Sequence, residues 1–96
     1  MQRYFAILEK EPGSLWGVYF PDLPGCVAAA ETADVALDNA ASALREVAED
    51  VADEGRSLPE PRSLEELQRD NEVREALAAG AALVAVPLHS METAGV

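Results

Sequence analysis

Few side chains in this sequence have the types that catalysis needs. It contains one histidine, His89, close to its end, and one cysteine, Cys26. A general base or a nucleophile needs a second group within hydrogen-bond reach. A lone histidine near a chain end is normally solvated, and a cysteine without a histidine partner is normally a small core residue. Zinc ligands at finger spacing and a glycine-rich loop before a helix are both missing from the sequence. We therefore expect no catalytic residues, no metal ligands and no cofactor, and hence no enzyme.

Carboxylates are the remaining groups with possible chemistry. If they converged at the end of a strand, they could hold two magnesium ions for phosphoryl transfer. Glu9 is the main acid on a predicted strand, whereas the others mostly follow one side of a predicted helix with Arg45 among them. That arrangement is typical of a solvated face. A metal-dependent nuclease is therefore the least favoured alternative.

The charge balance bears on the choice of partner. The sequence has 18 acidic residues against 7 Lys and Arg, and its formal net charge is −11 at pH 7. The few cations are scattered singly, whereas binding to phosphates needs clusters of them, so we expect no direct binding of nucleic acid. An acidic protein suits a basic protein partner, although such a charge also serves solubility alone. The sequence lacks a signal peptide and a membrane span, which predicts a cytoplasmic protein.

Three strands are predicted before the first helix. Residues 3–10 are β-favouring on both faces, Glu11-Pro12-Gly13-Ser14 is a turn signal, and residues 15–20 form a second strand. These two strands therefore form a hairpin. A second turn at Pro24-Gly25 allows residues 26–30 to return as a third strand.

A long amphipathic helix follows. Thr32 is a good N-cap and Gly55 a good stop. Between them, apolar residues recur at spacings of three and four: Leu37, Ala40, Leu44, Val47 and Val51. This pattern predicts a helix of about six turns, packed on a sheet through an alanine-rich stripe.

The second half of the chain predicts a further helical segment and a last strand. Leu58-Pro59-Glu60-Pro61 is an extended linker, and Ser63 with Glu66 forms a capping box. The helical segment over residues 63–80 is expected to break near Asp70-Asn71.

Residues 81–88 are apolar on both faces, which is typical of an interior strand that is covered on both sides. Residues 89–96 are expected to form a frayed tail.

The predicted order is therefore β-β-β-α-(α)-β, within a single domain over residues 1–96. It describes an α+β two-layer fold in which one helix crosses an antiparallel meander and the last strand joins the sheet. Because the core is built from small residues, it is thin. We expect the chain to gain stability as a homo-oligomer, a dimer or a tetramer.

With this order of elements, the sequence resembles the N-terminal domain of HicB-family antitoxins of type II HicAB toxin–antitoxin systems. The resemblance covers residues 3–62 and, more loosely, residues 83–87. The most specific part is the run Phe20-Pro21-Asp22-Leu23-Pro24-Gly25-Cys26, followed at the right distances by the helix and by the Leu-Pro-x-Pro linker.

The resemblance implies a partial ribonuclease-H-like fold that does not cut RNA. Its implied partner is HicA, a small basic toxin with a double-stranded-RNA-binding-like fold that cleaves messenger RNA. Inhibition in the family covers the toxin's catalytic histidine and RNA-facing surface, and members also self-associate. The favoured function is thus an antitoxin that binds and occludes a basic HicA-type toxin. The alternative is an orphan homo-oligomeric module of the HicB fold that binds another protein or a small ligand.

Two departures from the family pattern affect these expectations. Ala30 stands where the family usually has a glycine before the helix, so the corner between strand and helix is expected to differ. No helix-turn-helix or ribbon-helix-helix sequence follows the last strand. We therefore expect protein binding without operator binding.

The family motif has two possible roles. Asp22, Leu23, Pro24, Gly25 and Cys26 could shape the connection between two strands, with Leu23 and Cys26 filling the core, or they could face a partner. Asp22 is the member expected to face a partner or to accept a hydrogen bond from a backbone N–H of the turn.

Overall fold

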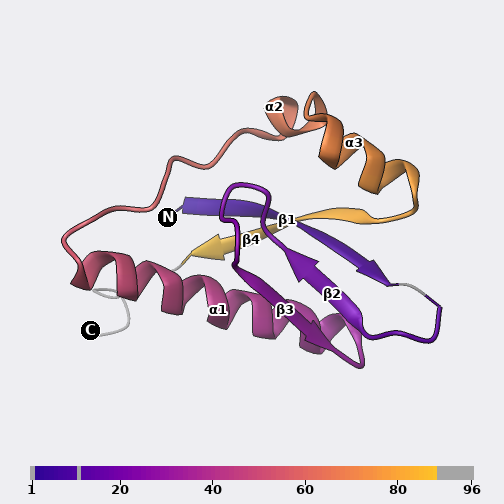
Figure 1. The fold of residues 1–96 in the computed structure, drawn as a ribbon, viewed down its shortest axis with the longest axis horizontal. Helices are drawn as coiled ribbons and strands as arrows, with labels where there is room; N and C mark the ends of the chain where they lie inside the picture. Colours follow the sequence, from indigo (N-terminus) through magenta and orange to yellow (C-terminus); the bar gives the residue numbers. More distant parts are fainter. Residues whose placement is uncertain (1, 11, 89–96) are drawn as a thin grey trace.

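The computed structural model describes residues 2–10 and 12–88. Figure 1 shows their arrangement, which follows the predicted order of elements. The elements are β1 (Gln2–Lys10), β2 (Trp16–Tyr19), β3 (Val27–Ala30), α1 (Ala33–Asp53), α2 (Leu64–Gln68), α3 (Asn71–Ala78) and β4 (Ala82–Leu88). The tail predicted over residues 89–96 lies outside the described residues.

The four strands form one antiparallel sheet in the order β3-β2-β1-β4. β1 lies between β2 and β4, but it has both neighbours only at Ile7 and Leu8. It pairs with β4 from Gln2 to Leu8, but with β2 only from Ile7 to Lys10. The first half of β1 thus has a strand neighbour on one side only.

The main core lies between α1 and one face of the sheet (Figure 1). The sheet contributes Tyr4, Ala6, Val18 and Val86, Phe20 adds to them directly after β2, and α1 contributes Ala36, Ala40 and Leu44. Since both α1 alanines are fully buried, the helix backbone can approach the strands closely. The predicted helix is confirmed, with the Thr32 hydroxyl accepting a hydrogen bond from the N–H of Val35 at 3.2 Å.

A smaller cluster lies on the opposite face of the sheet, where α2 and α3 pack (Figure 1). Ile7 from β1, Leu67 from α2 and Val73 from α3 are fully buried there. The α+β two-layer prediction is confirmed for the sheet and α1, and these two short helices add a partial layer. The predicted break in the helical segment is confirmed, because Asp70 caps a separate α3.

The prediction that the last strand is interior is wrong. β4 is an edge strand with β1 on one side and no strand on the other among the described residues. Its apolar pattern has another cause. Val86 packs in the core against α1, while Leu83 packs against the α2–α3 cluster. The apolar pattern of β4 therefore arises because both of its faces are partly covered, and it does not indicate whether the strand lies at an edge of the sheet.

The corner between β3 and α1 forms without glycine. Ala30 does not have a positive φ, since none of the described non-glycine residues does. The described residues include no helix that is long and apolar enough to cross a membrane.

The core predicts a strong contrast between two apolar residues of α1. Leu44 is fully buried, whereas Val35 is 48% exposed. We expect Leu44→Ala to lower the free energy of unfolding by about 2–5 kcal/mol, through lost burial and a residual cavity. Val35→Ala should stay within about 0.5 kcal/mol. Urea unfolding followed by circular dichroism checks both, and equal effects would contradict this core.

Candidate functional site

The family motif forms the connection between β2 and β3 through two successive turns. The N–H of Leu23 donates to the carbonyl of Phe20, and the N–H of Cys26 donates to the carbonyl of Leu23, both at 3.0 Å. Pro24 and Gly25 are the central residues of the second turn, and Gly25 has a φ of 91°. Proline followed by a residue with positive φ is the pattern of a type II turn. The turn between Leu23 and Cys26 thus favours proline and glycine at these two positions.

The side chains of the motif divide by burial. Leu23 and Cys26 are buried in the main core, whereas Pro24 and Gly25 are exposed. Leu23 and Cys26 thus lie in the core, as the structural alternative for them expects. Burial raises the pKa of the Cys26 thiol, which keeps it protonated and weakly nucleophilic.

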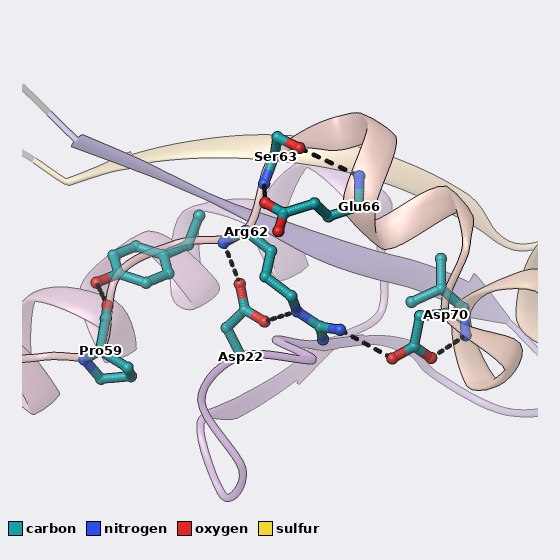
Figure 2. A network of polar contacts seen from close by, with 8 residues as sticks. Asp22, Pro59, Arg62, Ser63, Glu66 and Asp70 are labelled. Atoms are coloured by element: carbon teal, nitrogen blue, oxygen red, sulfur yellow. Dashed lines mark hydrogen bonds and ion pairs between the residues drawn. The ribbon is translucent and has the colours of Figure 1, made fainter.

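Asp22 binds the linker that follows α1. One of its carboxylate oxygens accepts a hydrogen bond from the backbone N–H of Arg62 at 2.8 Å, and the other from Arg62 Nε at 2.6 Å (Figure 2). The Asp22 side chain is only 9% exposed. It does accept a bond from a backbone N–H, as predicted, but from a residue 40 positions away instead of within its own turn.

Arg62 extends this contact to α3. Its Nη1 donates to Asp70 Oδ2 at 3.0 Å, while Asp70 Oδ1 accepts the N–H of Val73 at 3.1 Å as the helix cap (Figure 2). The hydrogen bond from Arg62 is the first cause that lowers the pKa of Asp70. The hydrogen bonds to Asp22 and Asp70 raise the pKa of Arg62. One guanidinium thus joins the motif, the linker and the start of α3.

Two further contacts hold the same linker. The hydroxyl of Tyr4 donates to the carbonyl of Pro59 at 2.6 Å. The predicted capping box is confirmed, with Ser63 N–H donating to Glu66 Oε1 at 2.9 Å and Glu66 N–H donating to Ser63 Oγ at 3.1 Å. Burial, followed by the nearby Glu60 and Asp22 carboxylates, raises the pKa of Tyr4. The linker is therefore held at Pro59 and by the two residues that directly follow it.

A hollow of about 350 Å³ opens beside the motif. Its walls come from the motif turn, the last part of α1, including Val47 and Val51, and the start of the linker, including Leu58. Pro24 and Gly25 are the exposed members of the motif at this hollow. It is an apolar depression that could receive a side chain from a protein partner.

The exposed side of α1 is strongly acidic. Arg45 is the only basic residue of this helix, and its exposed acidic residues are Asp34, Asp38, Glu46, Asp50 and Asp53. In the part of the chain that the structure describes, no group of three or more His, Cys, Asp or Glu could hold a metal ion. His89 lies outside that part. The structure therefore offers a turn, a hollow and an acidic helix face, which are features of a binding surface.

Comparisons with known proteins agree on one family. Residues 4–94 match the family model described as HicB_like antitoxin of bacterial toxin-antitoxin system. No curated protein matches the sequence.

Several solved structures share this fold. The crystal structure of the Burkholderia Pseudomallei antitoxin HicB is 29% identical, with a TM-score of 0.77 over 92% of this chain and 64% of that chain. The N-terminal domain of the same antitoxin is 28% identical, with a TM-score of 0.77 over 93% of this chain and 100% of that chain. A chain of the HicA3 and HicB3 toxin-antitoxin complex is 27% identical, with a TM-score of 0.71 over 93% of this chain and 100% of that chain. The chain thus spans less than two thirds of the longer antitoxin and the full length of its N-terminal domain.

The nearly buried carboxylate of Asp22 predicts a measurable coupling with Arg62. Hydrogen bonds to charged groups contribute more than neutral ones, so we expect Asp22→Ala to destabilise the fold by about 2 kcal/mol. In a double-mutant cycle with Arg62→Ala, the loss in the double variant should be smaller than the sum of the two single losses, although Arg62→Ala also removes the contact with Asp70. Urea unfolding of the four proteins measures this, and fully additive effects would show that the pair is not coupled.

The Arg62–Asp70 pair predicts a dependence of stability on pH. In the folded protein the pKa of Asp70 lies below its ordinary value of 3.8. Ionised Asp70 therefore stabilises the fold fully when the pH is above 3.8, and this stabilisation is lost as the pH falls through the lowered pKa. Asp70→Asn retains a good N-cap but removes the charge. Between about pH 5 and about pH 2, the variant should therefore lose less stability than the wild type. Chemical unfolding at several pH values tests this, and equal losses in the two proteins would contradict it.

Proposed function

The chain belongs to the HicB-like antitoxin family of bacterial toxin–antitoxin systems, and from this premise we propose that it binds and occludes a small basic toxin of the HicA type. The observation that carries the proposal is the family match over nearly the whole chain. It is supported by the likeness to a chain of the HicA3 and HicB3 toxin-antitoxin complex.

The charge of the chain supports a basic partner. A net charge of −11 creates a field that attracts a basic protein and speeds its encounter. Much of this charge lies on the exposed side of α1, where Arg45 is the only cation. We propose that this face directs the toxin to the antitoxin.

The motif contributes to the same surface in a limited way. We propose that Pro24 and Gly25 touch the toxin at the rim of the hollow that Val47, Val51 and Leu58 help to line. Asp22, Leu23 and Cys26 would then act indirectly, by holding the turn in position. The contact thus joins an acidic helix face to an apolar depression at its C-terminal end.

Inhibition would occur by occlusion, without chemistry on the antitoxin. The only cysteine is buried and its pKa is raised, so it is unsuited to act as a nucleophile. We infer that the protein is not an enzyme and that it acts in the cytoplasm, where the messenger RNA that such a toxin cleaves is found.

A direct experiment uses a small basic reading frame beside this gene. Its product should inhibit growth when expressed alone, and co-expression of this chain should restore growth. The two purified proteins should form a complex in which RNA cleavage is suppressed. If the folded chain neither binds nor silences that product, the proposed function is wrong.

The role of the acidic helix face can be tested with two variants of equal charge. The first carries Glu46→Gln, Asp50→Asn and Asp53→Asn on α1. The matched control removes three exposed acidic residues elsewhere, with Glu65→Gln, Glu72→Gln and Glu75→Gln. At low salt we expect the first to slow association with the toxin by about tenfold and the control to slow it much less.

This difference should shrink in high salt, because counterions screen the field. Stopped-flow or biosensor kinetics at two ionic strengths measure both variants. Equal slowing by the two would place the toxin contact away from α1.

A further inference from the structure

β4 has the composition of an interior strand and the position of an edge strand. Its sequence, Ala-Leu-Val-Ala-Val-Pro-Leu, contains no charged or hydrogen-bonding side chain. It pairs with β1 along its whole length, from Gln2↔Leu88 to Leu8↔Ala82. Its other edge has no strand partner among the described residues. An unpaired edge presents a row of backbone N–H and C=O groups that favours the addition of another strand.

Proteins normally protect such an edge with lysines, inward-pointing charges, bulges or prolines. In β4 the only such device is Pro87, one residue from its end. The stretch from Ala82 to Val86 has none. The opposite edge strand, β3, is also uncharged, but it spans only four residues. In addition, the Asn39 side chain of α1 donates to its Ala29 carbonyl at 3.3 Å. β4 is therefore the longer and less protected edge.

The surface beside β4 is hollowed and mostly apolar. One hollow of about 380 Å³ is lined by Gln2, Arg3, Ala85 and Pro87. A second hollow, of about 430 Å³, adds Phe5 and the 43%-exposed Leu64, with further lining from the end of the linker. The charged residues that line the two hollows are Arg3 and Arg62. Because Asp22 and Asp70 balance the charge of Arg62, Arg3 supplies the positive charge here. This is an unusual local charge for a chain with a net charge of −11.

The local charge decides which partner suits this edge. A basic protein is attracted to the acidic helix face, whereas the positive charge of Arg3 does not attract it to β4. A second copy of this chain carries the same net charge of −11 and is repelled from most of the surface. It can approach most easily where charge is sparse. β4 itself carries no charged side chain and the two hollows are lined by no acidic residue, whereas Glu60 lines a further hollow at the Leu88 end of the strand.

We infer that β4 is a dimerisation edge, along which two copies of this chain pair their β4 strands antiparallel into one continuous sheet. Antiparallel pairing of a strand with itself obeys a two-fold axis, as closed dimers require. Full overlap of residues 82–88 places the axis at their midpoint, so that Ala85 lies opposite Ala85 of the partner subunit. This dimer does not depend on the toxin, so it stands or falls separately from the proposed function.

The axis makes Ala85 the decisive position. Its side chain is exposed, so a charge there should be tolerated by the monomer but would face the same charge across the interface. We expect the wild type to elute at twice the 10.2 kDa mass of the chain in size-exclusion chromatography with light scattering. Ala85→Glu and Ala85→Lys should each raise the dimer dissociation constant by at least about tenfold.

Mixing the two variants gives the sharpest readout. A glutamate opposite a lysine is attractive, so an equimolar mixture of Ala85→Glu and Ala85→Lys should recover the dimer mass. Ala29→Glu is the matched control, because Ala29 is an exposed alanine on the opposite edge strand, and this variant should remain dimeric. Circular dichroism confirms that each variant is folded.

Three results would overturn the inference. The first is a wild type that stays monomeric up to the highest concentration that can be reached. The second is dissociation by Ala29→Glu but not by the Ala85 variants, which would assign the interface to β3. The third is a mixture of the two Ala85 variants that does not recover the dimer.

Discussion

The contact between Asp22 and Arg62 ties together parts of this molecule that the sheet alone would leave separate. The linker after α1 has to travel from one face of the sheet to the other before α2 and α3 can pack. Asp22 binds both the backbone N–H and the guanidinium group of Arg62, which directly follows the linker. The same guanidinium group binds Asp70, the N-cap of α3. Tyr4 fixes the linker a few residues earlier through Pro59. Without these bonds, the α2–α3 cluster would be held by three fully buried side chains and the partly buried residues around them.

A nearly buried charge is tolerable here because its hydrogen-bonding capacity is used. Removing a carboxylate from water is costly unless donors replace the lost hydration. Asp22 receives a backbone N–H and a charged N–H, and no buried side-chain polar atom of the described residues lacks a partner. The contacts of the motif within the chain are thus structural: its Pro-Gly turn lies beside Asp22, which binds the residue after the linker, while Leu23 and Cys26 anchor the turn in the core.

The sequence predicted what local rules determine. The Thr32 cap, the stop at Gly55 and the Ser63–Glu66 capping box all depend on residues within one turn of each other, and all are present. It did not predict the pairing of Asp22 with Arg62, because a separation of 40 residues leaves no periodic trace. Arg62 was accordingly missed as a member of the site. A single arginine directly after a Leu-Pro-x-Pro linker was the only signal available, and nothing in the sequence assigned it to one acid among many.

The prediction of an interior position for β4 was wrong for a different reason. Hydrophobic periodicity records which side chains avoid water, but it does not record whether the backbone edge is paired. In β4 both faces are partly covered, so the apolar pattern is satisfied without a second neighbouring strand. Its sequence nevertheless lacks charges that an exposed edge normally carries. Six of the 18 acidic residues lie instead on α1, mostly on its outer side. This separation of charge gives the molecule two unlike surfaces, one suited to a basic partner and the other to a second copy of itself. Both could be occupied at once, because α1 packs on one face of the sheet while the free edge of β4 lies along its side.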